Sequence, residues 1–147
     1  MSENNPHQAG RHFLQIPGPS NVPDRVLRAI AQPTIDHRGP EFAQLTLGVL
    51  DKLSAVFNTK SPIFIFPASG TGGWESSLLN TLCPGDKVLA FETGHFATLW
   101  KNVATKLGLE VIWVEGDWRQ GIDAAVVQQH LLEDQSHQIK AVLAVHT

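Results

Sequence analysis

The apolar residues of this chain follow two different periods along the sequence. Between residues 40 and 58 they recur at spacings of three and four, which places them on one face of a helix. These positions are Phe42, Leu45, Val49, Leu53 and Val56. Elsewhere, short apolar runs of strand length alternate with longer stretches that have helical character.

This pattern predicts an alternation of helices and strands along most of the chain. Helices are expected over residues 24–31, 40–58, 72–82, 95–107 and 123–132. Strands are expected over residues 63–66, 87–91, 110–114 and 139–145. Because short strands that alternate with helices are typical of βαβ units, the expected fold class is α/β, with a mostly parallel sheet flanked by helices.

Individual residues mark where several of these helices begin and end. Pro40 suits the first position of a helix, and Glu41 suits the positive end of the helix dipole. Gly108 is the expected residue just beyond the helix over 95–107, and Asp123 is the expected cap of the helix that follows it.

The composition excludes several classes of protein. The chain has 147 residues, of which 42% are apolar and 17% charged, and its net charge is -3. Such a balance gives no reason to expect a nucleic acid or an anionic membrane as partner. No apolar run approaches the roughly 20 residues that cross a bilayer, and the first residues lack the layout of a secretory signal. With Cys83 as its one cysteine, the chain is expected in the reducing cytoplasm.

The most informative segment is the glycine-rich stretch that follows the expected strand over 63–66. Gly70, Thr71, Gly72 and Gly73 stand where this strand would turn into a helix. Glycines let a backbone approach a ligand closely, and the free N–H groups at a helix start attract an anion such as phosphate. The P-loop and dinucleotide fingerprints do not fit, because Gly73 and Trp74 stand where lysine and serine or threonine would be needed, and Glu75 where a small residue would be needed. A tight turn without any ligand is the other interpretation of this segment.

Three segments, in order, carry a resemblance to a known family. They read PGPSNVP at residues 17–23, ASGTGGWE at 68–75 and LCPGDKVLAFETGHFATLW at 82–100. Together they resemble class V (fold-type I) aminotransferases, most closely serine–glyoxylate and alanine–glyoxylate aminotransferases, from about Phe13 to Thr147. The resemblance implies pyridoxal 5'-phosphate as cofactor, and small amino acids and 2-oxo acids as substrates. It also implies a homodimer and the large domain of the aspartate-aminotransferase-like fold.

The resemblance also implies roles for particular residues. Residues 70–73 correspond to the segment that holds the cofactor phosphate, although Gly73 lacks the side chain that some relatives carry there. Phe96 corresponds to the aromatic residue that stacks on the pyridine ring, where many relatives use tryptophan. Gly18 corresponds to a position near the substrate. His37 and Arg38 fall in a region close to the active site and subunit interface, or else in a solvated loop.

Several groups that the chemistry needs are not found in this sequence. A lysine must bind the cofactor aldehyde, a carboxylate must hold the pyridine nitrogen protonated, and an arginine must bind the substrate carboxylate. None of the lysines matches the catalytic position; they are Lys52, Lys60, Lys87, Lys101, Lys106 and Lys140. The histidines and Cys83 show no metal-ligand or nucleophile spacing.

We therefore expect an N-terminal arm over residues 1–23 and the N-terminal part of the cofactor-binding domain over residues 24–147. The rest of that domain and a small C-terminal domain would lie outside this sequence, because an apolar strand pattern runs into Thr147. Amino-transfer activity is expected of the full-length protein and not of this segment alone. The alternative is a non-catalytic α/β module that binds a phosphate or a nucleotide.

Overall fold

The computed structural model of the protein describes residues 18–146. They fall into two compact units, of which the first ends at Phe64 and the second begins at Ile65. Of the expected N-terminal arm, only residues 18–23 belong to the described part. The two units are taken separately below.

The first unit contains two helices, α1 (Asp24–Ile30) and α2 (Pro40–Val56), and both were predicted from the sequence. Pro40 occupies the first turn of α2 and is followed by Glu41, as expected from the fixed φ of proline and the positive end of the dipole. Neither helix has a buried residue, and Leu45 on the apolar stripe of α2 is 56% exposed. The periodicity thus predicted the helix correctly, but the described residues leave its apolar face largely uncovered.

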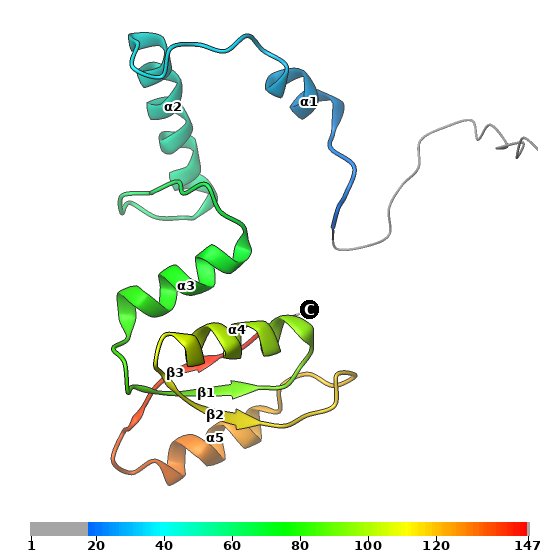
Figure 1. Cartoon of the computed structure of the whole chain (residues 1–147), viewed down its shortest axis with the longest axis vertical. Coiled ribbons are helices and arrows are strands. Elements are labelled where there is room, and N and C mark those ends of the chain that lie inside the picture. Colours follow the sequence, from blue (N-terminus) through cyan, green and yellow to red (C-terminus); the bar gives the residue numbers. More distant parts are fainter. Residues whose placement is uncertain (1–17, 147) are drawn as a thin grey trace, which may run out of the picture. The chain divides into compact units, whose positions relative to one another are not determined.

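The second unit is a small α/β sheet structure (Figure 1). Its elements are α3 (Gly70–Thr81), β1 (Lys87–Phe91), α4 (His95–Lys106), β2 (Glu110–Val114), α5 (Ala124–Glu133) and β3 (Ile139–Leu143). The strands are all parallel and lie in the order β2-β1-β3, with α4 over one face and α5 over the other. The predicted parallel α/β arrangement is confirmed for this part of the chain.

The core of this unit is built around the central strand. Val88 and Leu89 of β1 are fully buried, because β1 has a strand on each side and a helix over each face. Val88 belongs to an apolar cluster with Ala104 of α4 and Leu143 of β3. The predicted helix ends are also found: Gly108 has a φ of +80, and the Asp123 carboxylate accepts a hydrogen bond of 2.8 Å from the N–H of Ala125.

The prediction of a strand over residues 63–66 was wrong. The segment is irregular, and Phe64, Ile65 and Phe66 are 76%, 62% and 71% exposed. A strand requires a neighbour that completes its hydrogen-bond ladder, and the sheet of the described residues contains only β1, β2 and β3. The last predicted strand is also shorter than expected, because β3 ends at Leu143 and not at Val145.

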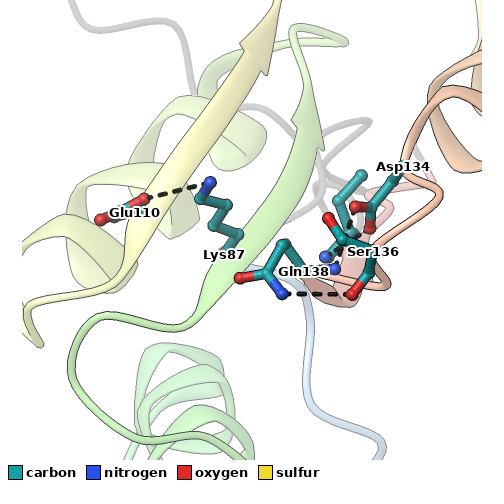
Figure 2. Close-up of polar contacts among 6 residues, drawn as sticks. Lys87, Glu110, Asp134, Ser136 and Gln138 are labelled. Carbon is teal, nitrogen blue, oxygen red and sulfur yellow. Dashed lines mark hydrogen bonds and ion pairs between the residues drawn. The ribbon is translucent and has the colours of Figure 1, made fainter.

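Polar contacts fix the ends of the sheet at which the strands begin (Figure 2). The Asp134 carboxylate accepts hydrogen bonds from the N–H groups of Ile139, at 2.7 Å, and of Gln138, at 3.0 Å. The Ile139 bond first and then the Gln138 bond lower the pKa of Asp134 below its ordinary value of 3.8. Lys87 Nζ lies 3.9 Å from Glu110 Oε2, and these two residues are the first of β1 and of β2. Asp134 therefore fixes the point at which the turn after α5 enters β3.

Candidate functional site

The glycine-rich segment forms the first turn of α3, which begins at Gly70 and so two residues earlier than predicted. Ser69 is the residue before the helix, and its side chain makes no capping hydrogen bond. Its carbonyl oxygen accepts a bond of 2.9 Å from the N–H of Gly72. The N–H groups of Gly70 and Thr71 precede the first helical hydrogen bonds, so they remain available to an anion at the positive end of the dipole.

The glycines of this turn differ in what surrounds them. A Cβ atom on Gly72 would lie 2.7 Å from the Cβ of Ala68, which is closer than two carbon atoms can approach. A Cβ atom on Gly70 or on Gly73 would meet nothing within 4 Å. Gly72 is therefore needed for the close approach of the chain to itself, whereas the backbone at Gly70 and Gly73 is open to a ligand.

Phe96 lies in the same unit, at the second residue of α4, and α3 and α4 pack against each other. Its ring centroid is 6.1 Å from that of Trp74, with an interplanar angle of 68°. Trp74 is the fifth residue of α3 and directly follows Gly73, so Phe96 contacts a side chain from the N-terminal half of α3. Phe96 is 47% exposed, which leaves part of its ring accessible to another molecule.

A phosphorylated aromatic ring fits these groups. The first turn of α3 offers backbone N–H donors and the exposed Thr71 hydroxyl for a phosphate. The accessible part of the Phe96 ring offers a surface on which an aromatic ring can stack. His95 is exposed beside Phe96, with 5.8 Å between the ring centroids. Backbone donors and a hydroxyl suit a phosphate, and an aromatic surface suits a planar ring.

Other residues singled out from the sequence lie elsewhere. Gly18, His37 and Arg38 belong to the first unit, and the predicted role of Gly18 near the substrate stays a prediction. No lysine of the described residues is buried. Lys101 lies 4.5 Å from the centre of the Trp113 ring, as a cation–π contact, and Lys87 pairs with Glu110.

A hollow that the sequence did not predict lies at the carboxyl ends of β1 and β3. It has a volume of about 570 Å³, and its lining includes Thr93, Trp118, Arg119 and His146. Trp118 Nε1 donates a hydrogen bond of 3.1 Å to Glu92 Oε1, which ties the loop after β2 to the end of β1. Trp118 and Glu92 each follow the end of a strand, and the carboxyl ends of parallel strands lie at the same edge of a sheet. This shared position was the one signal in the sequence that could have predicted their contact.

Residues 18–146 contain neither a membrane-spanning helix nor a cluster of metal ligands. No helix in this range is long and apolar enough to span a membrane. No group of three or more histidine, cysteine, aspartate or glutamate side chains in the same range is arranged to hold a metal ion.

Comparison with known proteins identifies the family. The family described as aminotransferase class-V matches residues 12–146. The chain belongs to this family. The class-V match includes the whole of α3, β1 and α4, and therefore the glycine-rich turn and Phe96.

Individual relatives agree with this assignment. This class-V chain is 47% identical to the serine–glyoxylate aminotransferase of Methylorubrum extorquens over 93% of its own length, and 42% identical to the L-aspartate–glyoxylate aminotransferase of Paracoccus denitrificans over 89%. It spans about a third of the length of these relatives, namely 34% and 33%. Its structure is similar to that of the ureidoglycine–glyoxylate aminotransferase of Bacillus subtilis, with a TM-score of 0.71 and 26% identity over 80% of this chain and 31% of that one. The predicted fold class, part of a pyridoxal-phosphate-dependent transferase large domain, is thereby confirmed.

Proposed function

We propose that this chain contributes the phosphate- and ring-binding part of a pyridoxal-phosphate-dependent aminotransferase. In the full-length protein, an amino group would pass from serine or alanine to glyoxylate. The observation that carries the proposal is the contact between Trp74 and Phe96, at 6.1 Å between ring centroids. It joins an accessible aromatic ring to the helix whose first-turn glycines, Gly70 and Gly73, are open to a ligand, within a chain of the class-V family.

The residues divide the binding between them. The first-turn N–H groups of α3 and the Thr71 hydroxyl would hold the phosphate, which the helix dipole favours. Phe96 would cover one face of the pyridine ring, and stacking adds roughly 0.5–1.5 kcal/mol to what area burial supplies. When bound, the cofactor supplies an electron sink for bonds at the amino carbon of the substrate. This chain's own part is to seat and orient the cofactor, and the covalent bond to a lysine is not assigned to any lysine of the described residues.

The names of the relatives support the amino acceptor more broadly than the amino donor. The three relatives described above are named for serine, L-aspartate and ureidoglycine, yet all three are named for glyoxylate. We therefore propose glyoxylate as the amino acceptor and a small amino acid as the donor, with serine favoured by the 47% identity to the serine–glyoxylate enzyme.

The full-length protein is also proposed to be a homodimer. What supports this is the apolar stripe of α2, where Leu45 and Val56 are 56% and 75% exposed although the helix has a regular amphipathic pattern. Light scattering of the full-length gene product should give the mass of two chains. Leu45→Glu should lower that mass, whereas Glu41→Gln, the matched change outside the stripe, should leave it at two chains.

Binding and turnover of the full-length gene product test the enzymatic proposal. The cofactor-free protein should bind pyridoxine 5'-phosphate, which has an alcohol in place of the aldehyde and so cannot react with lysines. Phe96→Leu should weaken this binding by roughly two- to tenfold, and Phe96→Trp should restore it, because the loss concerns the ring face alone. The loaded protein should form glycine from glyoxylate when serine or alanine is supplied.

Two results would count against the proposal. Binding of nucleotides or sugar phosphates in preference to pyridoxine phosphate would favour the non-catalytic module. Glycine formation from residues 1–147 alone, at the rate of the full-length protein, would show that this segment holds catalytic groups that we do not find in it.

A further inference from the structure

An aromatic cluster lies between α3 and α4, and it consists of Trp74, Phe96 and Trp100. The rings of Trp74 and Trp100 are stacked, with centroids 5.8 Å apart and an interplanar angle of 18°. Trp74 meets Phe96 in an edge-type contact at 68°. Trp74 is thus the ring that touches both of the others.

Trp100 connects this cluster to the core of the unit. It is half-buried and packs against the apolar cluster formed by Val88, Ala104 and Leu143, among others. Its Nε1 atom is buried and finds no hydrogen-bond acceptor among the described residues. Packing and stacking, rather than a hydrogen bond, therefore hold the Trp100 ring and give Trp74 a fixed surface to lie on.

Phe96, by contrast, is a partly exposed side chain at the start of α4. It lies on the first turn of α4 and is 47% exposed, and the other ring contact found for it is with the exposed His95. An exposed phenylalanine can occupy several rotamers, so its ring plane depends on its neighbours. Trp74 is the neighbour that is itself anchored, through Trp100, to the core.

From this arrangement we propose that Trp74 is a positioning residue that sets the plane of the Phe96 ring for stacking on the pyridine ring. The inference rests on the proposed function, because it assumes that Phe96 covers the cofactor. Trp74 acts through Phe96, whereas the phosphate is held by backbone groups of α3 that do not require the indole. Loss of Trp74 should therefore weaken recognition of the ring and leave recognition of phosphate unchanged.

The test compares two probes on the cofactor-free, full-length gene product: pyridoxine 5'-phosphate, which has the ring, and inorganic phosphate, which does not. The measured quantity is the preference for the ring, defined as the dissociation constant of inorganic phosphate divided by that of pyridoxine 5'-phosphate, and both constants come from calorimetric titration. Trp74→Leu should reduce this ratio by roughly two- to tenfold, the range expected for one edge-type aromatic contact, with inorganic phosphate bound as before. Trp74→Phe, which keeps an aromatic edge, should recover most of the loss.

Two controls separate positioning from general damage. Phe57→Leu changes an aromatic residue of the first unit, 65% exposed, and should leave the ratio unchanged. In a protein that already carries Phe96→Leu, Trp74→Leu should have no further effect on the ratio. If Trp74→Leu does not fold, as judged by circular dichroism, Trp74→Met replaces it, because methionine fills much of the same space without a ring.

The other outcomes overturn either the positioning role of Trp74 or the proposed function. If Trp74→Leu keeps the ratio, or weakens both probes equally, Trp74 does not position Phe96 and the inference is overturned while the proposed function stands. An effect of Trp74→Leu that persists in the Phe96→Leu background overturns it as well. If the unaltered protein binds the ringed probe no more tightly than phosphate, the proposed function itself fails.

Discussion

Gly72 and Gly73 are neighbours in the first turn of α3, and replacing each by alanine should have opposite effects on stability. A Cβ atom at position 72 would lie 2.7 Å from the Cβ of Ala68, whereas one at position 73 would meet nothing within 4 Å. Both substitutions replace a poor helix former by a good one, which favours the helix by up to about 1 kcal/mol. Only the first forces two carbon atoms together.

The magnitude follows from these two opposing effects. Overpacking of one methyl group costs about 1–3 kcal/mol, because the backbone near Ala68 must move. Gly73→Ala should therefore raise the free energy of unfolding by about 0.5–1 kcal/mol. Gly72→Ala should lower it by up to about 2 kcal/mol, so that the two variants differ by roughly 1–3 kcal/mol.

Urea unfolding of the full-length gene product, without cofactor and followed by tryptophan fluorescence, measures this difference. Trp74 follows the turn directly and reports on the unit that contains α3. Equal midpoints for the two variants, or a higher midpoint for Gly72→Ala, would refute the close approach at Ala68 and with it our description of the turn.

Three further predictions concern the rest of the second unit. Asp123→Ala should lower the free energy of unfolding by about 1 kcal/mol, because it removes the hydrogen bond that caps the first turn of α5. Ser69 is the N-cap residue of α3 but makes no capping bond, so Ser69→Ala should be nearly neutral in urea unfolding. The pKa of Asp134 is lowered by the N–H groups that its carboxylate accepts, so its contribution is present above pH 3.8 and is lost as the pH falls below that value. Asp134→Asn should accordingly be less stable than the unaltered chain at neutral pH, and the difference between their melting temperatures should shrink in acid. A difference that grows in acid would contradict this prediction. Leu89→Ala should cost about 2–5 kcal/mol, because Leu89 is fully buried in the central strand, and a loss below 1 kcal/mol in the same unfolding assay would place this residue outside the core.

Local patterns predicted those elements whose stability is decided locally. The helix from Pro40 to Val56 has a regular apolar period, and the Asp123 cap and the φ of +80 at Gly108 follow from the chemistry of single residues. The strand β1 was predicted because a run of apolar residues in an α/β pattern suits a position with neighbours on both sides.

The errors and omissions concern contacts between distant residues. The apolar run from Ile63 to Phe66 has the composition of a strand, but a strand also needs a neighbour, and a sequence pattern does not supply one. The contacts of Trp74 with Phe96 and of Trp118 with Glu92 join elements through the fold, so neither follows from spacing. For the candidate site, the sequence indicated the groups that could bind a cofactor, and the structure added which of them lie together.

The central claim is that a cofactor phosphate is held by the first turn of α3 while its pyridine ring lies against Phe96. A crystal structure of the full-length gene product with pyridoxal phosphate tests this claim most directly. The account predicts phosphate oxygens within hydrogen-bond distance of N–H groups in residues 70–73, and the Phe96 ring stacked on the pyridine. A phosphate bound elsewhere, or a pyridine ring with no contact to Phe96, would contradict it.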